Sequence, residues 1–227
     1  MRAIVSILIS ALVLAPAGAA QRPAETLRAA EQVLKASVTA PDKGIPKDLL
    51  ERAECVGVFP GVKKGAFVVG GEFGRGVFSC RMRDGSMSAP AHFTMGGPSL
   101  GWQFGGQEAD IVLLVMNEGG LKHLLSSKFT LGGEASAAAG PVGRTAQAAT
   151  DAQLHAQILS WSRSRGVFLG ASIEGIVVRP DEKAIEELYG RPLTARQILV
   201  DQSVRVPAEA KSFVRATSQY AKRSSQG

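Results

Sequence analysis

The residues best suited to chemistry in this chain are cations placed beside glycines. Lys63 and Lys64 lie between Gly61 and Gly65, where the glycines indicate a turn. The other candidates also fall at or next to expected turns, and they are Arg75, Arg81, Arg83, Arg163 and Arg165. Arginine binds phosphate through paired hydrogen bonds, and lysine binds it as a point charge. Several such turns at one end of a β body would form an electropositive rim for a phosphate headgroup; the alternative is that they are solvated turn residues.

No pattern in the sequence predicts catalysis. Residues 97–101, Gly-Pro-Ser-Leu-Gly, match the nucleophile-elbow pattern G-x-S-x-G, but that motif needs a helix directly after the serine. The residues that follow alternate and end in two glycines, which favours a hairpin. Residues 71–76 are glycine-rich but lack the G-K-[S/T] ending of a phosphate loop. We therefore expect a protein that is not an enzyme.

Metal binding is not indicated either. His92, His123 and His155 are widely separated, and no C-x-x-C or H-x-x-x-H pair is present in the sequence. We expect neither a metal nor another cofactor.

Short strands separated by glycines must position the cations. Apolar runs with paired glycines between them predict strands and turns, and the runs are 56–59, 66–69, 77–80, 91–95, 111–116, 129–131, 166–169 and 176–178. Helical patterns lie on both sides, at 23–38, 46–53, 182–189, 195–200 and 207–221. We predict an α+β fold, with a glycine-rich antiparallel β body, barrel-like or sandwich, flanked by N- and C-terminal helices.

The terminal helices offer a second way to contact a membrane. Leu27 and Leu34 share an apolar face in the first helix, and Phe213 and Val214 share one in the last. Because the remaining surface of both helices is rich in basic residues, each helix could lie in a bilayer interface. The alternative is that both apolar faces dock on the β body.

The first 20 residues have the layout of a secretory signal peptide. Arg2 is followed by an apolar stretch and by small residues at 17–20. The stretch is shorter than the ~20 residues that span a bilayer, so we expect cleavage and export to the periplasm or the envelope periphery. Without Arg2 the chain keeps 25 basic and 20 acidic residues. This excess is compatible with an anionic partner but does not indicate nucleic acid.

The two cysteines, Cys55 and Cys80, could pair in an oxidising compartment. If strands 55–59, 66–71 and 76–81 form a meander, the middle strand separates the cysteines by two strand spacings, roughly 10 Å. A disulfide needs Cα atoms within about 7 Å. We therefore expect two buried free thiols, with a disulfide as the less favoured alternative.

Several ordered motifs resemble the SYLF family of lipid-binding domains. Among them are Cys55-Val-Gly-Val-Phe-Pro-Gly-Val-Lys-Lys-Gly-Ala-Phe67 and Gly70-Gly-Glu-Phe-Gly-Arg-Gly76, and the others lie at 101–110, 111–117, 127–133, 138–144 and 160–175. The resemblance covers roughly residues 30 to 190. The resemblance implies a SYLF-like lipid-binding domain, which we place at 21–190. The predicted signal peptide at 1–20 precedes it, and the helical patterns predict a C-terminal helical extension at 191–227 packed on or beside it.

The resemblance implies a non-enzymatic lipid-binding protein at a membrane surface. Phosphoinositides are the ligands associated with eukaryotic SYLF domains, which also include actin-binding proteins of the endocytic machinery. An exported bacterial member would not meet actin, so we expect an anionic or envelope phospholipid as the partner, and neither actin nor nucleic acid. The alternative is a structural or protein-interaction module of the bacterial envelope without lipid specificity.

Overall fold

The computed structural model describes residues 22–40, 44–65, 71–98, 108–141, 155–164, 167–171 and 173–221. The predicted signal peptide lies outside these residues, and so does Arg165.

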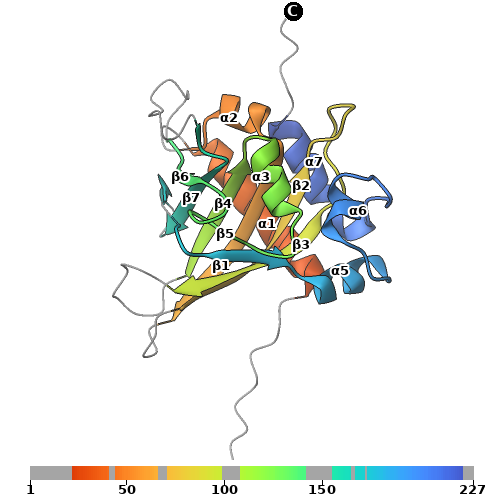
Figure 1. Cartoon of the computed structure of the whole chain (residues 1–227). Helices are drawn as coiled ribbons and strands as arrows, with labels where there is room; N and C mark the ends of the chain where they lie inside the picture. Colours follow the sequence, from red (N-terminus) through yellow and green to blue (C-terminus); the bar gives the residue numbers. More distant parts are fainter. Residues whose placement is uncertain are drawn as a thin grey trace, which may run out of the picture.

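Within the described residues, nine strands form one curled sheet in the order β5-β9-β3-β2-β1-β4-β7-β6, and β8 pairs with β7 (Figure 1). The strands are β1 (Cys55–Gly65), β2 (Gly71–Cys80), β3 (Ala91–Pro98), β4 (Glu108–Val115), β5 (Phe129–Thr130), β6 (Ala137–Ala139), β7 (Ile158–Ser164), β8 (Val167–Gly170) and β9 (Val177–Pro180). The pairs are antiparallel except for β6 with β7, which is parallel. The predicted α+β class is confirmed, and the β body is a single sheet rather than a sandwich.

The helices lie mainly at the two ends of the chain, as predicted. They are α1 (Pro23–Thr39), α2 (Lys47–Arg52), α3 (Glu118–Leu124), α5 (Glu182–Tyr189), α6 (Ala195–Leu199) and α7 (Lys211–Tyr220), the last preceded by the 3-10 turn η2 (Ala208–Ala210). Asp181 caps α5 by accepting a hydrogen bond from the amide of Ala184, and Gly190 ends it with a φ of 69°. Of the described helices, none is long and apolar enough to cross a bilayer.

Alternating side chains place an apolar core on both faces of the sheet. We call the face covered by α1, α2 and α7 the helix face; its strand residues include Val56, Val58, Val112 and Leu114. The other face carries Phe59, Phe78 and Phe93 and also packs against α6. The Phe78 ring lies edge-on to Phe59 and Phe93, with centroids 5.7 and 4.9 Å away. Gly57 makes room for this packing, because a Cβ there would lie 2.2 Å from the Phe78 ring.

The apolar faces of the terminal helices belong to this core. Leu27, Leu34 and Phe213 have no exposed surface, and Val214 is partly buried against the same cluster. In Figure 1, α1 (red to orange) crosses the sheet, and α7 lies beside it. The prediction that these four residues contact a membrane is therefore corrected, because the apolar faces of both helices dock on the sheet.

The two cysteines form a disulfide, so the preference for free thiols was wrong. Cys55 and Cys80 are direct cross-strand partners on β1 and β2, with Cα atoms 3.9 Å apart. The prediction assumed a strand between them. Instead β1 continues to Gly65 and β2 begins at Gly71, so the two strands are neighbours and the cysteines meet where β1 starts and β2 ends.

His92 joins three elements beneath the start of α1. It lies on β3 with 2% of its surface exposed, and its Nε2 is 3.2 Å from the carbonyl oxygen of Pro23, the first residue of α1. The backbone carbonyl of His92 accepts a hydrogen bond from the amide of Asp181, the residue before α5. Burial lowers the pKa of His92 to about 4, so the imidazole is neutral at pH 7.

Reduction of the disulfide should lower the free energy of unfolding by about 3 kcal/mol, because it releases a loop closed between residues 25 apart. Urea unfolding of the wild-type protein with and without reductant measures this difference. The C55A/C80A variant is the control and should not respond to the reductant. Two free thiols titrating in the unfolded, unreduced protein would contradict the bond.

Acidification should destabilise the protein through His92. Between pH 6.5 and about 4 the unfolded chain binds a proton that the folded protein excludes, so stability falls as the pH drops, by up to about 3 kcal/mol at pH 4. The unfolding free energy of H92Q should lose this part of the pH dependence. H123Q, at a partly exposed position on α3, should keep it, and equal slopes for the two variants would refute the assignment.

Candidate functional site

The helix face of the sheet continues beyond the start of α1. Thr94 and Gly96 follow His92 on the same face of β3, and Phe73 is the cross-strand partner of Gly96. Phe73 is 54% exposed. A side chain this exposed shows that the described helices do not cover this part of the helix face.

Cross-strand pairing brings cations to this uncovered surface in two rows. One row runs from Lys63 on β1 through Phe73 and Gly96 to Val177 on β9. The next row places Arg75, Thr94 and Arg179 side by side on β2, β3 and β9. Lys128, directly before β5, lines the same groove as Arg179. We call Lys63, Arg75, Lys128 and Arg179, with Phe73 among them, the basic shelf.

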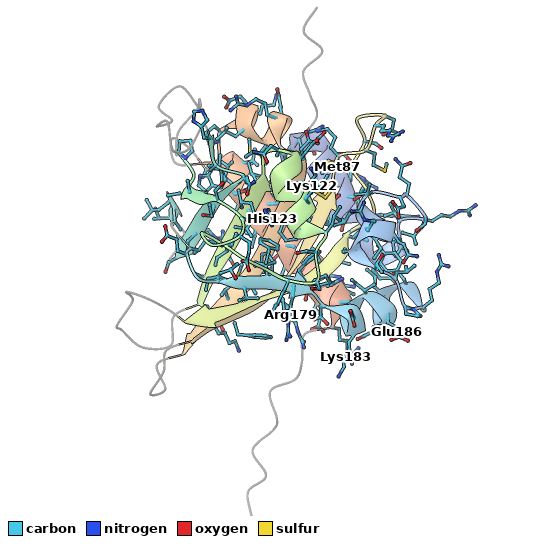
Figure 2. The ribbon with its side chains drawn as sticks, viewed as in Figure 1. Met87, Lys122, His123, Arg179, Lys183 and Glu186 are labelled. Carbon is cyan, nitrogen blue, oxygen red and sulfur yellow. A yellow bond between two sulfur atoms is a disulfide. The ribbon has the colours of Figure 1, made fainter. Side chains whose placement is uncertain are left out.

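A groove of about 340 Å³ lies on the basic shelf. It is lined by polar, cationic and apolar groups, namely Phe73, Thr94, Met95, Gly96, Lys128, Val177 and Arg179. Figure 2 shows Arg179 at the lower edge of the sheet, on the same side of the molecule as Lys183 of α5. A volume near the lower end of the usual range for ligand sites, ~300–1,000 Å³, suits a small headgroup better than a whole lipid.

Two of the four shelf cations have carboxylate neighbours. Lys63 Nζ lies 3.8 Å from Glu108, and both side chains are largely exposed, so water screens this pair. Arg75 Nε lies 3.5 Å from Asp181, which is mostly buried. Arg75 therefore ties the shelf to the first turn of α5, while the Lys63 pair can open at low cost.

Among the residues that the structure describes, the other two cations face the groove without an acidic partner. Arg179 Nε donates a hydrogen bond to Thr94 Oγ1 at 3.3 Å, which orients the guanidinium group. Among the described residues, no carboxylate lies within 4.0 Å of the Lys128 ammonium or the Arg179 guanidinium. The shelf as a whole thus carries four positive and two negative charges, an arrangement suited to an anion.

Of the seven predicted headgroup residues, the described part of the structure places Lys63 and Arg75 on the shelf, and Arg83 is exposed in the turn after β2. Lys64 follows Lys63 on β1, but its side chain lies outside the described part of the structure, as does the whole of Arg165. Arg81 and Arg163 have other roles.

Arg81 lies at the opposite end of β2 from the shelf, next to Cys80. Its Nη2 donates hydrogen bonds to the carbonyl oxygens of Glu51 (3.0 Å), Ala53 (3.2 Å) and Ala221 (2.6 Å), and its Nε also donates to Ala53. This guanidinium satisfies the C-terminal carbonyls of α2 and α7. The prediction that Arg81 binds a headgroup is corrected.

Arg163, on β7, pairs with Asp110 near the start of β4. Its Nε donates to Asp110 Oδ2 at 2.7 Å, and Asp110 Oδ1 accepts the amide of Gly61 at 3.0 Å, where β1 bulges. Its charge is therefore offset by Asp110, and the pair holds β1, β4 and β7 together. A role in headgroup binding is not supported for Arg163.

Sequence reasoning missed three members of the shelf, Phe73, Lys128 and Arg179. The run Val177-Val178-Arg179 indicates a strand with a cation on one face. The run does not show which other strand pairs with it. Phe73 falls within a segment that resembled a turn. The pairing of β9 with β3, which joins residues more than 80 positions apart, creates the site.

The described residues contain no group of three or more His, Cys, Asp or Glu side chains that could hold a metal ion. The described residues of the shelf offer hydrogen-bond donors and positive charge.

Comparisons with known proteins agree with the fold and the motifs. Similar proteins include LAS seventeen-binding protein 3 of Saccharomyces cerevisiae, 35% identical over 161 residues, which are 70% of this chain and 35% of that protein. Protein YSC84 of the same yeast is 33% identical over 77% of this chain and 37% of its own length. SH3 domain-containing YSC84-like protein 1 of Homo sapiens is 28% identical over 86% of this chain and 56% of its own length.

The chain thus spans between about a third and just over half of the length of these relatives. The family described as "Ysc84: Las17-binding protein actin regulator" matches residues 96–220, from the end of β3 to the last residue of α7. Since this match covers more than half of the chain and agrees with the SYLF motifs, the chain belongs to the Ysc84 (SYLF) family.

Proposed function

We propose that this protein is a non-enzymatic module that binds anionic phospholipid headgroups at a membrane surface through the basic shelf. The observation that carries the proposal is the pair of groove-lining cations, Lys128 and Arg179, without a carboxylate partner among the described residues. Anionic lipid surfaces attract such cations with about 1 kcal/mol per Lys or Arg near the surface.

The position of Phe73 supports a lipid surface as the anion. Its ring is exposed between Lys63 and the groove, and an amphipathic boundary of apolar and headgroup layers favours aromatic side chains next to cations. A soluble anion would gain nothing from the ring.

The family supports a binding role. The relatives are named for binding or for domain composition, and the family description names an actin regulator. We further propose that residues 1–20 direct export and are removed, which would place the protein at the bacterial envelope and away from actin. The lipid would then be an envelope phospholipid, with phosphoinositide-type headgroups as the counterpart in eukaryotic relatives.

Neutralising both groove cations should weaken binding to anionic vesicles roughly thirtyfold, since each contributes about 1 kcal/mol. The test is co-sedimentation of K128Q/R179Q, without the predicted signal peptide, with phosphatidylcholine vesicles containing phosphatidylglycerol. Binding of the wild-type protein should also weaken between low and moderate salt.

The matched control is R196Q/K211Q, which removes two exposed cations from α6 and α7. It should bind nearly as well as the wild-type protein. Equal loss in both double variants would assign binding to net charge alone, and no binding to neutral, anionic or phosphoinositide vesicles at low salt would refute the proposed function.

A second candidate is a protein-interaction module of the envelope without lipid specificity. It is favoured by β8, which pairs only with β7 among the described strands and exposes 42% of Val167 and 54% of Leu169. An unpaired strand edge with apolar side chains can accept a strand from another chain. The relatives named as LAS seventeen-binding proteins also suggest a protein partner.

The second candidate predicts a stable oligomer or complex that V167S/L169S disrupts, with no effect on lipid binding. Light-scattering measurement of the mass of wild-type and variant proteins tests self-association. A monomeric wild-type protein with no captured partner would remove this candidate.

A further inference from the structure

We infer that the groove prefers lipids whose headgroup is a single phosphate monoester, and that Phe73 contacts the apolar part of the same lipid. This inference rests on the proposed function, because it names the headgroup class that the basic shelf would select.

The charge of the groove matches one phosphate monoester. Lys63 and Arg75 have Glu108 and Asp181 as neighbours, so the surplus is the two charges of Lys128 and Arg179. A phosphate monoester carries about −1.5 to −2 charges at pH 7. A phosphodiester headgroup would leave part of this surplus uncompensated, and a headgroup with several phosphates would exceed it.

The donors in the groove can surround one phosphate. Thr94 Oγ1 accepts a hydrogen bond from Arg179 Nε, so the hydroxyl proton of Thr94 is free to point elsewhere. Arg179 and Lys128 line the same groove, and the terminal nitrogens of Arg179 and the ammonium of Lys128 are further donors. Thr94 lies on β3, Arg179 lies on β9, and Lys128 directly precedes β5. In the sheet β9 lies between β3 and β5, and adjacent strands are about 4.8 Å apart. A monoester presents three terminal oxygens, one for each group.

The shape of the groove directs the rest of the ligand toward Phe73. Gly96 and Val177 lie between the Arg179 position and Phe73, and Gly96 has no side chain to block the path. A phosphate held by Arg179 would therefore extend its ester-linked chain along Gly96 to the exposed ring. Free phosphate would contact the donors but not the Phe73 ring. A substitution of Phe73 therefore distinguishes a lipid phosphate from free phosphate as the ligand.

The experiment compares vesicles of equal nominal charge that contain phosphatidic acid, phosphatidylglycerol or a bisphosphorylated phosphoinositide in phosphatidylcholine. The wild-type protein should bind phosphatidic acid vesicles at least tenfold more tightly than the other two. T94V keeps the net charge and nearly the shape of the side chain, and it should reduce binding to phosphatidic acid about tenfold, the effect of one hydrogen bond to a charged group. Because Thr94 also orients Arg179, T94V should weaken binding to phosphatidylglycerol slightly, and clearly less than it weakens binding to phosphatidic acid.

The contribution of Phe73 is tested with F73S on the same phosphatidic acid vesicles. Loss of half of a Phe side chain's burial should weaken binding roughly fivefold, and this loss should persist at high salt. V200S, which changes an exposed apolar residue after α6, is the control and should bind like the wild-type protein. Glycerol 3-phosphate and inorganic phosphate are added as soluble competitors and should displace the vesicles only weakly.

The outcomes separate the two proposals. Binding that follows vesicle charge alone, with T94V equal to wild type for all lipids, would overturn the monoester preference and leave the proposed function intact. Full displacement by inorganic phosphate together with unchanged binding of F73S would overturn the lipid contact and assign the groove to free phosphate. Absence of binding to every vesicle would remove the proposed function and the inference with it.

Discussion

The structure depends on one constraint: the central strands must bury apolar side chains on both faces of a single sheet. In β4, the consecutive apolar residues Ile111 to Val115 alternate between the two faces, and all five are buried. Such a sheet is stable only where other elements cover both sides. The apolar residues of the terminal helices are therefore part of the core and are not available to contact a membrane.

The same constraint determines where a binding surface can form. The contact of His92 with Pro23 marks the point where α1 begins, and the strands continue past it. Beyond that point the helix face carries cations, a threonine and Phe73 in place of a buried apolar row. Arg81 and Arg179 illustrate the contrast within one residue type. The donors of Arg81 are occupied by the carbonyls that end two helices, whereas Arg179 is oriented by one hydroxyl and faces a groove.

Local patterns in the sequence were sufficient to predict where helices and strands lie, but not which strands pair with each other. Asp181, Gly190 and Thr194 predict the ends of α5 and the start of α6 correctly, because capping depends on residues a few positions apart. The cysteine prediction failed because it divided residues 55–81 into three strands. The structure has two neighbouring strands there, β1 and β2, so Cys55 and Cys80 are direct cross-strand partners. Arg179 was missed for a related reason: its place beside Thr94 follows from strand order, and strand order is a property of the whole chain.

The residues of the basic shelf lie partly inside and partly outside the segment that matches the family. Residues 96–220 contain Lys128, Val177 and Arg179, whereas Lys63, Phe73 and Arg75 come from β1 and β2, before the matched segment. The in-register pairing of β2 with β3 is what joins the two sets. The two groove cations, which have no acidic partner in the described part of the chain, thus belong to the matched segment, and Phe73 and the two cations beside carboxylates belong to strands outside it. If the proposed function holds, a substitution of Phe73 on β2 would change lipid affinity, whereas substitutions of Lys128 and Arg179 in the matched segment would change headgroup preference.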